Sequence, residues 1–302
     1  MSKVIVLGAK GRFGRAAITA FVEAGWDVRA MARSWDGPLP GGVTQVTGDV
    51  RDTAALQALC AGCDVIVNAV NPPYEDWSEM LPPITRSVIA AASKTGATVI
   101  IPGNVYNYGA GAGAVLREDT PWEPTSRKGQ LRVEMEEAYR ASGVRTLVVR
   151  GGDFLEAAQS GNWFDAHIAA KSAKGRTMYP GPMDQVHAWA YLPDMARATV
   201  ALAERREAFA SFEEFGFPGY ALTGAGLVEA IEEAVGVPQK VSSLPWFLVR
   251  LMGLFQATMR EVVEMRYLWR VPHRIDGAKL RATLPDFQPT PLDVAMKQIL
   301  LR

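Results

Sequence analysis

The chain has 302 residues, of which 48% are hydrophobic, so it can bury a sizeable core as one large α/β domain or as a domain with a smaller cap. Its 32 basic and 32 acidic side chains give a formal net charge of zero, and this balance indicates no nucleic-acid or anionic-membrane surface. The first expected strand begins at Lys3, which leaves no room for a signal peptide, and we therefore expect a cytoplasmic protein.

Residues 3–33 have the pattern of a strand, a glycine-rich turn, a helix and a second strand. The β-branched run at 3–7 is long enough for a strand and too short for a helix, and it leads into a G-x-x-G-x-x-G turn. Apolar residues then recur at helical spacing as far as Gly25, and 27–31 has the composition of a strand. This is the context that a dinucleotide-binding turn requires.

The three glycines of the turn have separate physical roles. Gly8 lets the chain turn sharply off the strand, Gly11 lets the backbone approach a pyrophosphate, and Gly14 lets the helix lie near the sheet. The helix N-terminus offers N–H groups to the anion. The turn residues assigned to the same site are Lys10, Arg12 and Phe13. We predict dinucleotide binding, and the alternative is an ordinary glycine-rich turn.

The charge at the end of the second strand indicates which dinucleotide is bound. An NAD site normally carries Asp or Glu there to accept a hydrogen bond from the ribose 2′-hydroxyl, but this chain has Arg33. Lys10 and Arg12 add two cations close to where a 2′-phosphate would lie. We therefore favour NADP(H) over NAD(H). The alternative is that all three are solvated surface charges and that Asp36 folds back toward the ribose.

The alternation of strands and helices continues along the chain. Further strands are expected at 43–46, 64–70, 97–101 and 144–150, and further helices at 53–61, 78–95 and 124–142. This order predicts a Rossmann-type doubly wound parallel sheet of the α/β class. We assign residues 1–152 to an NADP-binding domain to which 185–215 returns, and 153–302 to a smaller, mostly helical substrate cap, chiefly 153–184 and 216–302.

Cys60 and Cys63 form a C-x-x-C pair at the end of an expected helix, where the helix dipole disfavours a thiolate. The three histidines, His167, His187 and His273, show no spacing that would complete a metal site with them. We therefore interpret both cysteines as packing residues and predict no metal site.

Two later stretches have a distinctive composition. Aromatic residues gather at 162–164 and 187–191, and they form either a pocket wall or, for at least one of them, part of the core. The apolar segment 244–259 is interrupted by Pro245, Arg250 and Gly253 and is too short to span a bilayer, so no transmembrane segment is expected. For this segment we favour burial in the cap or a subunit interface over a monotopic membrane contact.

Together with the glycine turn, several short motifs resemble the extended branch of the short-chain dehydrogenase/reductase superfamily, the NAD-dependent epimerase/dehydratase type. They are the 48–50 loop (GDV), the strand end at 68–69 (NA), and the stretches 104–109 (NVYNYG), 118–121 (EDTP) and 191–196 (YLPDMA). The resemblance covers about the first 200 residues. It implies that Asp49 touches the adenine, and that Asn68 and Ala69 line the adenosine side of the groove. Val50 and Val70 are assigned to the same site. In many relatives two long helices, here 78–95 and 124–142, form a homodimer interface.

The catalytic positions depart from the pattern of that branch. By the resemblance, the usual Ser is Asn104, the usual Tyr is Lys128 and the usual Lys is Arg132. Asn104 can still donate a hydrogen bond to a developing oxyanion, and Arg132 can still hold ribose hydroxyls. Lys128 either handles the proton, with a pKa lowered by Arg132 and partial burial, or binds an anionic group. Tyr106 and Tyr108 are alternative phenolic acids, although in the family such tyrosines mostly pack beside the site.

The expected substrate is a small molecule. Nucleotide-sugar enzymes of this branch carry an Asn three residues after a strand arginine, whereas Arg150 is followed there by Asp153, whose carboxylate would repel a diphosphate. A smaller carbonyl or hydroxyl compound fits better, and its expected contacts are Tyr74, Tyr106, Asp153, Trp163, His187 and Trp189.

We therefore expect an NADP(H)-dependent oxidoreductase or epimerase/dehydratase-like enzyme. Because the usual Tyr and Lys are absent, the main alternative is a non-catalytic NADP(H)-binding redox sensor or regulator of the same fold. A structural protein that merely inherited the fold is a third interpretation.

Overall fold

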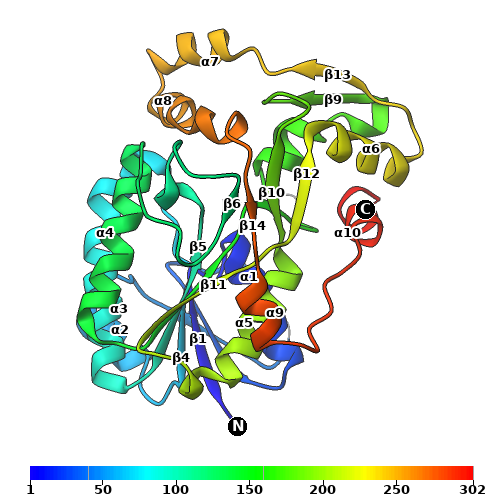
Figure 1. Ribbon diagram of the computed structural model, residues 1–302. Helices are drawn as coiled ribbons and strands as arrows, with labels where there is room; N and C mark the ends of the chain where they lie inside the picture. The colour runs from blue at the N-terminus through cyan, green and yellow to red at the C-terminus, as the bar shows by residue number, and fades with distance from the viewer. Residues whose placement is uncertain (40, 159, 302) are drawn as a thin grey trace. The chain divides into compact units, whose positions relative to one another are not determined.

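The structure is a computed structural model that describes residues 1–39, 41–158 and 160–301 (Figure 1). It divides into two compact units. Unit 1 comprises Met1–Gly103, Gln130–Arg150 and Met195–Phe215, and unit 2 comprises Asn104–Gly129, Gly151–Asp194 and Gly216–Arg302.

Unit 1 contains a seven-stranded sheet with the order β11-β7-β5-β4-β1-β2-β3. The strands are β1 (Lys3–Leu7), β2 (Asp27–Ala32), β3 (Val43–Thr47), β4 (Val65–Asn68), β5 (Thr98–Gly103), β7 (Thr146–Arg150) and β11 (Phe212–Gly216). Neighbouring strands from β3 to β7 pair in parallel. The chain order reverses between β1 and β4, and ligands of such sheets bind at the carboxyl ends of the strands on either side of that reversal. The predicted doubly wound sheet is confirmed.

Helices flank this sheet on both faces. They are α1 (Arg12–Glu23), α2 (Thr53–Leu59), α3 (Trp77–Thr95), α4 (Arg127–Ser142) and α5 (Leu192–Glu204). Figure 1 shows α2, α3 and α4 on one face and α1 and α5 on the other. Right-handed crossovers account for α1 on one face and for α2, α3 and α4 on the other, because the chain moves from β1 to β3 in one direction and from β3 through β4 to β7 in the other. Both faces of β4 are therefore covered, and all four of its residues are buried.

Unit 2 contains three small sheets, ordered β12-β10-β8, β13-β9 and β14-β6. Their strands are β6 (Val115–Leu116), β8 (Asp153–Leu155), β9 (Arg176–Tyr179), β10 (Val186–Tyr191), β12 (Tyr220–Thr223), β13 (Lys240–Ser243) and β14 (Arg274–Ile275). Its helices are α6 (Gly224–Val235), α7 (Trp246–Gly253), α8 (Ala257–Glu264), α9 (Ala278–Thr283) and α10 (Leu292–Leu300). A buried cluster that includes Phe164, Trp189 and Ile231 forms its core.

The division into units differs from the predicted domain boundaries at 104–129, at 151–152 and at 185–194. Residues 104–129 belong to unit 2, because β6 pairs with β14. Residues 185–194 also belong to unit 2, because β10 pairs with β8 and β12 rather than with the seven-stranded sheet. The cap was expected to be mostly helical, and unit 2 contains three small sheets in addition to its helices. The strands of these sheets have two to six residues, which is too short for a recognisable alternating pattern in the sequence. No helix among the described residues combines the length and the apolarity needed to cross a membrane.

Candidate functional site

The glycine turn connects β1 to α1 in the conformation that its sequence requires. Gly8 has a φ of +76°, and a Cβ there would lie 2.8 Å from the Ala69 carbonyl oxygen at the end of β4. A Cβ on Gly14 would lie 2.3 Å from the Gly8 carbonyl oxygen, so the first turn of the helix packs directly on the end of the strand. Both positions therefore exclude a side chain.

The N-terminus of α1 has the electrostatic character of an anion site. Gly11 precedes the helix, no side chain caps it, and the first turn contains no acidic residue. The Gly11 amide donates to the Gly8 carbonyl over 2.9 Å, and this hydrogen bond closes the turn. The first N–H groups of the helix have no intrahelical acceptor and point toward the turn. A dinucleotide pyrophosphate fits such a turn by charge and by backbone approach.

The positive charges beside the turn are not equivalent. Lys10 forms an ion pair with Asp36. Part of the positive charge of Lys10 is therefore neutralised, and the Asp36 carboxylate contacts this lysine. Arg33 follows β2 directly and has no ion pair with a carboxylate among the described residues. Arg33 is therefore the cation that the structure leaves available at the end of β2.

Asp49 lies beside a second arginine that the sequence reasoning did not select. Arg51 Nη2 contacts Asp49 Oδ2 at 2.6 Å, and this hydrogen bond lowers the pKa of Asp49 to about 2, with a smaller contribution from the charge of Arg33. Arg33, Asp49 and Arg51 therefore belong to one charged group. The only sequence signal for Arg51 is its position two residues after Asp49.

The end of β4 is held by a contact inside unit 1. Asn68 Nδ2 donates to the Tyr139 hydroxyl of α4 over 3.1 Å, and both side chains are buried. Burial raises the pKa of the Tyr139 phenol. Ala69 donates its amide to Leu7 of β1, so the carboxyl ends of the two central strands are joined beside the turn. Val50 and Phe13, also assigned to the cofactor site, are buried in the same unit, and Val70 is half-buried.

Two of the three predicted catalytic positions lie on α4. Lys128 and Arg132 are four residues apart on this helix, and both are buried. Arg132 donates to the Pro102 carbonyl over 2.7 Å, and its guanidinium lies over the Trp77 ring at 5.8 Å from the ring centre. Tyr74 meets the same ring edge-on at 5.1 Å. Tyr74, Trp77 and Arg132 are therefore brought together within unit 1.

The ammonium group of Lys128 is bound to two carboxylates of unit 2. Both Glu261 and Glu264 of α8 form ion pairs with it, and only 1% of the Lys128 side chain is exposed. These partners lie 133 and 136 residues away in the sequence, so no local pattern could reveal them.

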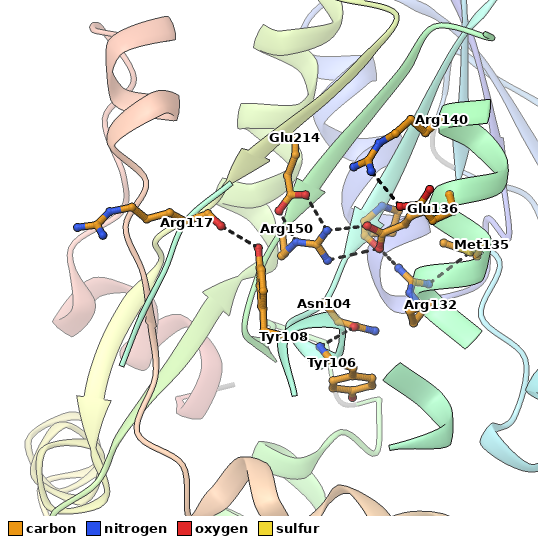
Figure 2. Close-up of polar contacts among 12 residues, drawn as sticks. Asn104, Tyr106, Tyr108, Arg117, Arg132, Met135, Glu136, Arg140, Arg150 and Glu214 are labelled. Carbon is orange, nitrogen blue, oxygen red and sulfur yellow. Dashed lines mark hydrogen bonds and ion pairs between the residues drawn. The ribbon is translucent and has the colours of Figure 1, made fainter. Parts of the chain in front are cut away.

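The third position, Asn104, begins a tight turn in unit 2. Its side-chain oxygen accepts a hydrogen bond from the Tyr106 amide over 3.0 Å, as Figure 2 shows, so the Asn104 amide nitrogen is the atom that can act as a donor. Tyr106 is buried, and the Tyr108 hydroxyl donates to the Arg117 carbonyl.

Arg150, at the end of β7, is enclosed by acidic side chains within unit 1 (Figure 2). Its guanidinium contacts Glu136 Oε2 at 2.6 Å and Glu214 Oε1 at 2.5 Å, and Arg150 and Glu136 are almost fully buried. Through its two carboxylate partners this buried arginine links β7, α4 and β11, and it belongs to the core of unit 1 rather than to a substrate contact.

Four of the predicted substrate residues form one aromatic and polar cluster in unit 2. His187 Nε2 lies 2.8 Å from Asp153 Oδ2, and the His187 ring stacks on Trp269 at 4.3 Å. Trp163 and Trp189 also contact Trp269. Trp189 has no exposed surface, so it packs as a core residue, which was the alternative for these aromatics. Trp269 joins the cluster but was not selected from the sequence.

The cluster also contains His273, a residue for which the sequence indicated no role beyond a possible metal ligand. Its ring lies 4.6 Å from that of His187, and its Nδ1 pairs with the Val271 carbonyl. Burial, reinforced by His187, lowers the pKa of His273 to about 4, so this imidazole is neutral at pH 7. Among the residues that the structure describes, no group of three or more potential ligands could hold a metal ion.

The two cysteines lie away from these groups and are buried in unit 1. Burial raises the pKa of the Cys60 thiol to about 12 and also raises that of Cys63. Thiols that resist ionisation in this way behave as small packing groups.

Comparison with known proteins identifies the family of the chain. Residues 8–176 match the model of the family described as NAD(P)H-binding, which is more than half of the chain. No curated protein matches the sequence.

Several solved structures have the same fold. One is a protein from Burkholderia cenocepacia J2315 that is named provisionally as an epimerase. It shares 20% identity with this chain, over 99% of this chain and 97% of its own, and its TM-score is 0.79. The UDP-glucose 4-epimerase of Bifidobacterium longum, solved with NAD+ and UDP, has 16% identity over 99% and 97% and a TM-score of 0.76. The UDP-N-acetylglucosamine 4-epimerase of Bacillus cereus has 14% identity over 100% and 99% and a TM-score of 0.77. The chain belongs to the NAD(P)H-binding family and has the same fold as these epimerases.

Proposed function

We propose that the chain is an NADP(H)-dependent oxidoreductase of the epimerase/dehydratase type that acts on a small carbonyl or hydroxyl compound. The observation that carries this proposal is the glycine turn at the end of β1, with Arg33 in place of the carboxylate that would select NAD(H). Arg51 lies beside Asp49 in the same charged group, where this carboxylate neutralises part of its charge.

The nicotinamide dinucleotide, when bound, supplies hydride transfer to or from carbon. The groups that would hold it are the backbone amides of Arg12, Phe13 and Gly14 at the pyrophosphate and the Arg33 guanidinium at the 2′-phosphate. This assignment rests on the side-chain-free turn, because both Gly8 and Gly14 already contact backbone atoms within 3 Å of where a Cβ would lie.

Two groups of unit 2 have the chemistry to act on a substrate oxygen. The Asn104 amide nitrogen would donate to an oxygen on which negative charge develops. Asp153 Oδ2 lies 2.8 Å from His187 Nε2, and a carboxylate in this position orients an imidazole. His187 is therefore our candidate for proton transfer to the substrate alongside Lys128.

The substrate that this arrangement supports is smaller than a nucleotide sugar. Arg150 is engaged by two buried carboxylates, and Asp153, the carboxylate that contacts His187, would repel a diphosphate. The epimerases with the same fold are named for UDP-sugars, so a UDP-sugar is the comparison substrate for any assay.

A second function is favoured by the contacts of Lys128. Its ammonium is bound to Glu261 and Glu264, so the position that carries the catalytic Tyr in the family is occupied by an ion-paired group. This supports a sensor whose NADP(H)-bound state changes a protein contact without turnover. A sensor must bind NADP+ and NADPH with different affinities, because a ligand shifts only an equilibrium between states that it binds differently.

The two functions are separated by a turnover assay. NADPH oxidation is measured with a panel of aldehydes, ketones and quinones, and epimerisation is measured with UDP-glucose. The enzyme proposal expects oxidation with at least one small carbonyl and a loss of turnover in Asn104→Ala with little change in NADPH affinity. Absence of turnover across the panel, together with unequal NADP+ and NADPH affinities, would instead support the sensor.

A further inference from the structure

The α7 helix and the turn that follows it carry a row of exposed apolar side chains. We name these six residues the apolar ridge: Phe247, Leu248, Leu251, Met252, Leu254 and Phe255. Phe247 is 70% exposed and Phe255 is 85% exposed. The sequence favoured burial of this segment in the cap or in a subunit interface; burial in the cap is wrong for these six side chains, and the subunit interface stays a prediction. Large apolar side chains gathered on one surface usually mark a binding face.

The surroundings of the ridge are basic. Residues 234–260 contain no Asp or Glu, and Arg250 and Arg260 are exposed. The nearest carboxylates that follow, Glu261 and Glu264, are bound to Lys128. A balanced net charge over the whole chain conceals this local excess of arginine.

Two further arginines extend the basic surface. Arg266 lies over the Trp246 ring at the start of α7, at 5.3 Å from the ring centre. Burial, followed by the nearby charges of Arg270 and Arg250, lowers the pKa of Arg266. Among the described residues, no carboxylate forms an ion pair with Arg250, Arg266 or Arg270. Phosphate oxygens suit guanidinium groups that are gathered in this way.

We propose that the apolar ridge and the arginines beside it bind the surface of a membrane that contains anionic phospholipids. The ridge side chains would enter the boundary between headgroups and acyl chains, and the arginines would contact lipid phosphates. The helix α7 has eight residues, far fewer than the roughly 20 that cross a bilayer, so it would lie along the surface.

A second copy of the chain is the less favourable occupant of this face. In a symmetric dimer the same surface meets itself, so the apolar ridge and the arginines of one copy would pack against the ridge and the arginines of the other. Such like-charge contacts oppose association, whereas an anionic lipid surface neutralises them.

The test is flotation of the purified full chain with lipid vesicles. One set contains phosphatidylcholine alone, and the other contains phosphatidylcholine mixed with phosphatidylglycerol. We expect binding to the anionic vesicles and weaker binding as salt is raised. Phe247→Ser with Phe255→Ser should reduce the affinity by about tenfold or more, because both rings lose their apolar burial. Arg250→Gln with Arg270→Gln should reduce it roughly thirtyfold, from two lost basic contacts.

Val294→Ser is the matched control, because Val294 is an exposed apolar residue of α10 outside the ridge. Circular dichroism and NADPH titration verify that each variant is folded. Failure to float with either vesicle would overturn the proposal, and so would ridge variants that bind as well as the control. A dimer in solution that dissociates in Phe247→Ser with Phe255→Ser, without vesicle binding, would assign the face to self-association instead.

Discussion

Replacing Lys128 with methionine tests whether this lysine anchors the structure or transfers a proton. The change removes a buried cation from between Glu261 and Glu264, whose side chains are 19% and 25% exposed. Breaking a buried ion pair by removing one partner costs about 3–5 kcal/mol, and because these carboxylates keep some water we expect about 2–3 kcal/mol here. Urea unfolding of Lys128→Met should therefore show a free energy of unfolding lower by that amount.

A compensated variant separates the two roles of Lys128. Lys128→Met combined with Glu261→Gln and Glu264→Gln removes all three charges, so most of the lost stability should return. If Lys128 transfers the proton, this triple variant is stable but does not turn over substrate. Recovery of both stability and turnover would make Lys128 an anchor only. An unfolding free energy of Lys128→Met within about 0.5 kcal/mol of the wild type would refute the ion-pair reasoning itself.

Three further predictions follow from the described contacts. Gly14→Ala should weaken NADPH binding in a fluorescence titration by about tenfold or more, because its Cβ would lie 2.3 Å from a backbone oxygen; Gly37→Ala, whose Cβ would meet no atom within 4 Å, should bind normally. The pKa of His273 is lowered from 6.5 to about 4, so its contribution to the free energy of unfolding is complete above pH 6.5, and about 3 kcal/mol of it is lost as the pH falls to 4. In urea unfolding measured over this pH range, His273→Gln should lose less stability than the wild type. An unchanged pH dependence would contradict the assignment. Arg51→Gln should raise the pKa of Asp49 from about 2 toward 3.8 in a carboxyl NMR titration, and a pKa that stays near 2 would contradict the contact.

The cofactor half of the fold could be predicted because its signals are local. The strand at 3–7, the glycine turn and the helix behind it follow from the order of residues within one short stretch, and β1 and α1 occur where they were expected. The positive φ of Gly8 is a property that only glycine adopts readily, so the residue type itself indicated the turn.

The candidate site was harder to predict because its partners are distant and its helix is polar on the buried side. The face of α4 that is buried carries Lys128, Arg132, Glu136 and Tyr139, whereas a helix is usually recognised by an apolar buried face. Each of the four finds its partner elsewhere in the chain. Positions that break the apolar pattern in this way are where functional or strongly constrained groups are expected.

The exposed apolar ridge was also beyond sequence reasoning. An apolar run of this length is the usual mark of a buried helix, and burial depends on what packs against it rather than on its own composition. The excess of arginine around Trp246 emerges only when 250, 266 and 270 are brought together by the fold.

The central claim is that the glycine turn of unit 1 binds NADP(H) and that Arg33 selects it. The most direct measurement is a fluorescence titration with NADPH and with NADH, in the wild type, in Arg33→Ala and in Arg15→Ala, an exposed arginine of α1 that serves as the control. We predict that the wild type and Arg15→Ala prefer NADPH by roughly tenfold to a hundredfold, and that Arg33→Ala loses this preference while retaining NADH binding. Equal affinity of the wild type for both dinucleotides would contradict the role of Arg33, and absence of binding to either would contradict the assignment of the turn.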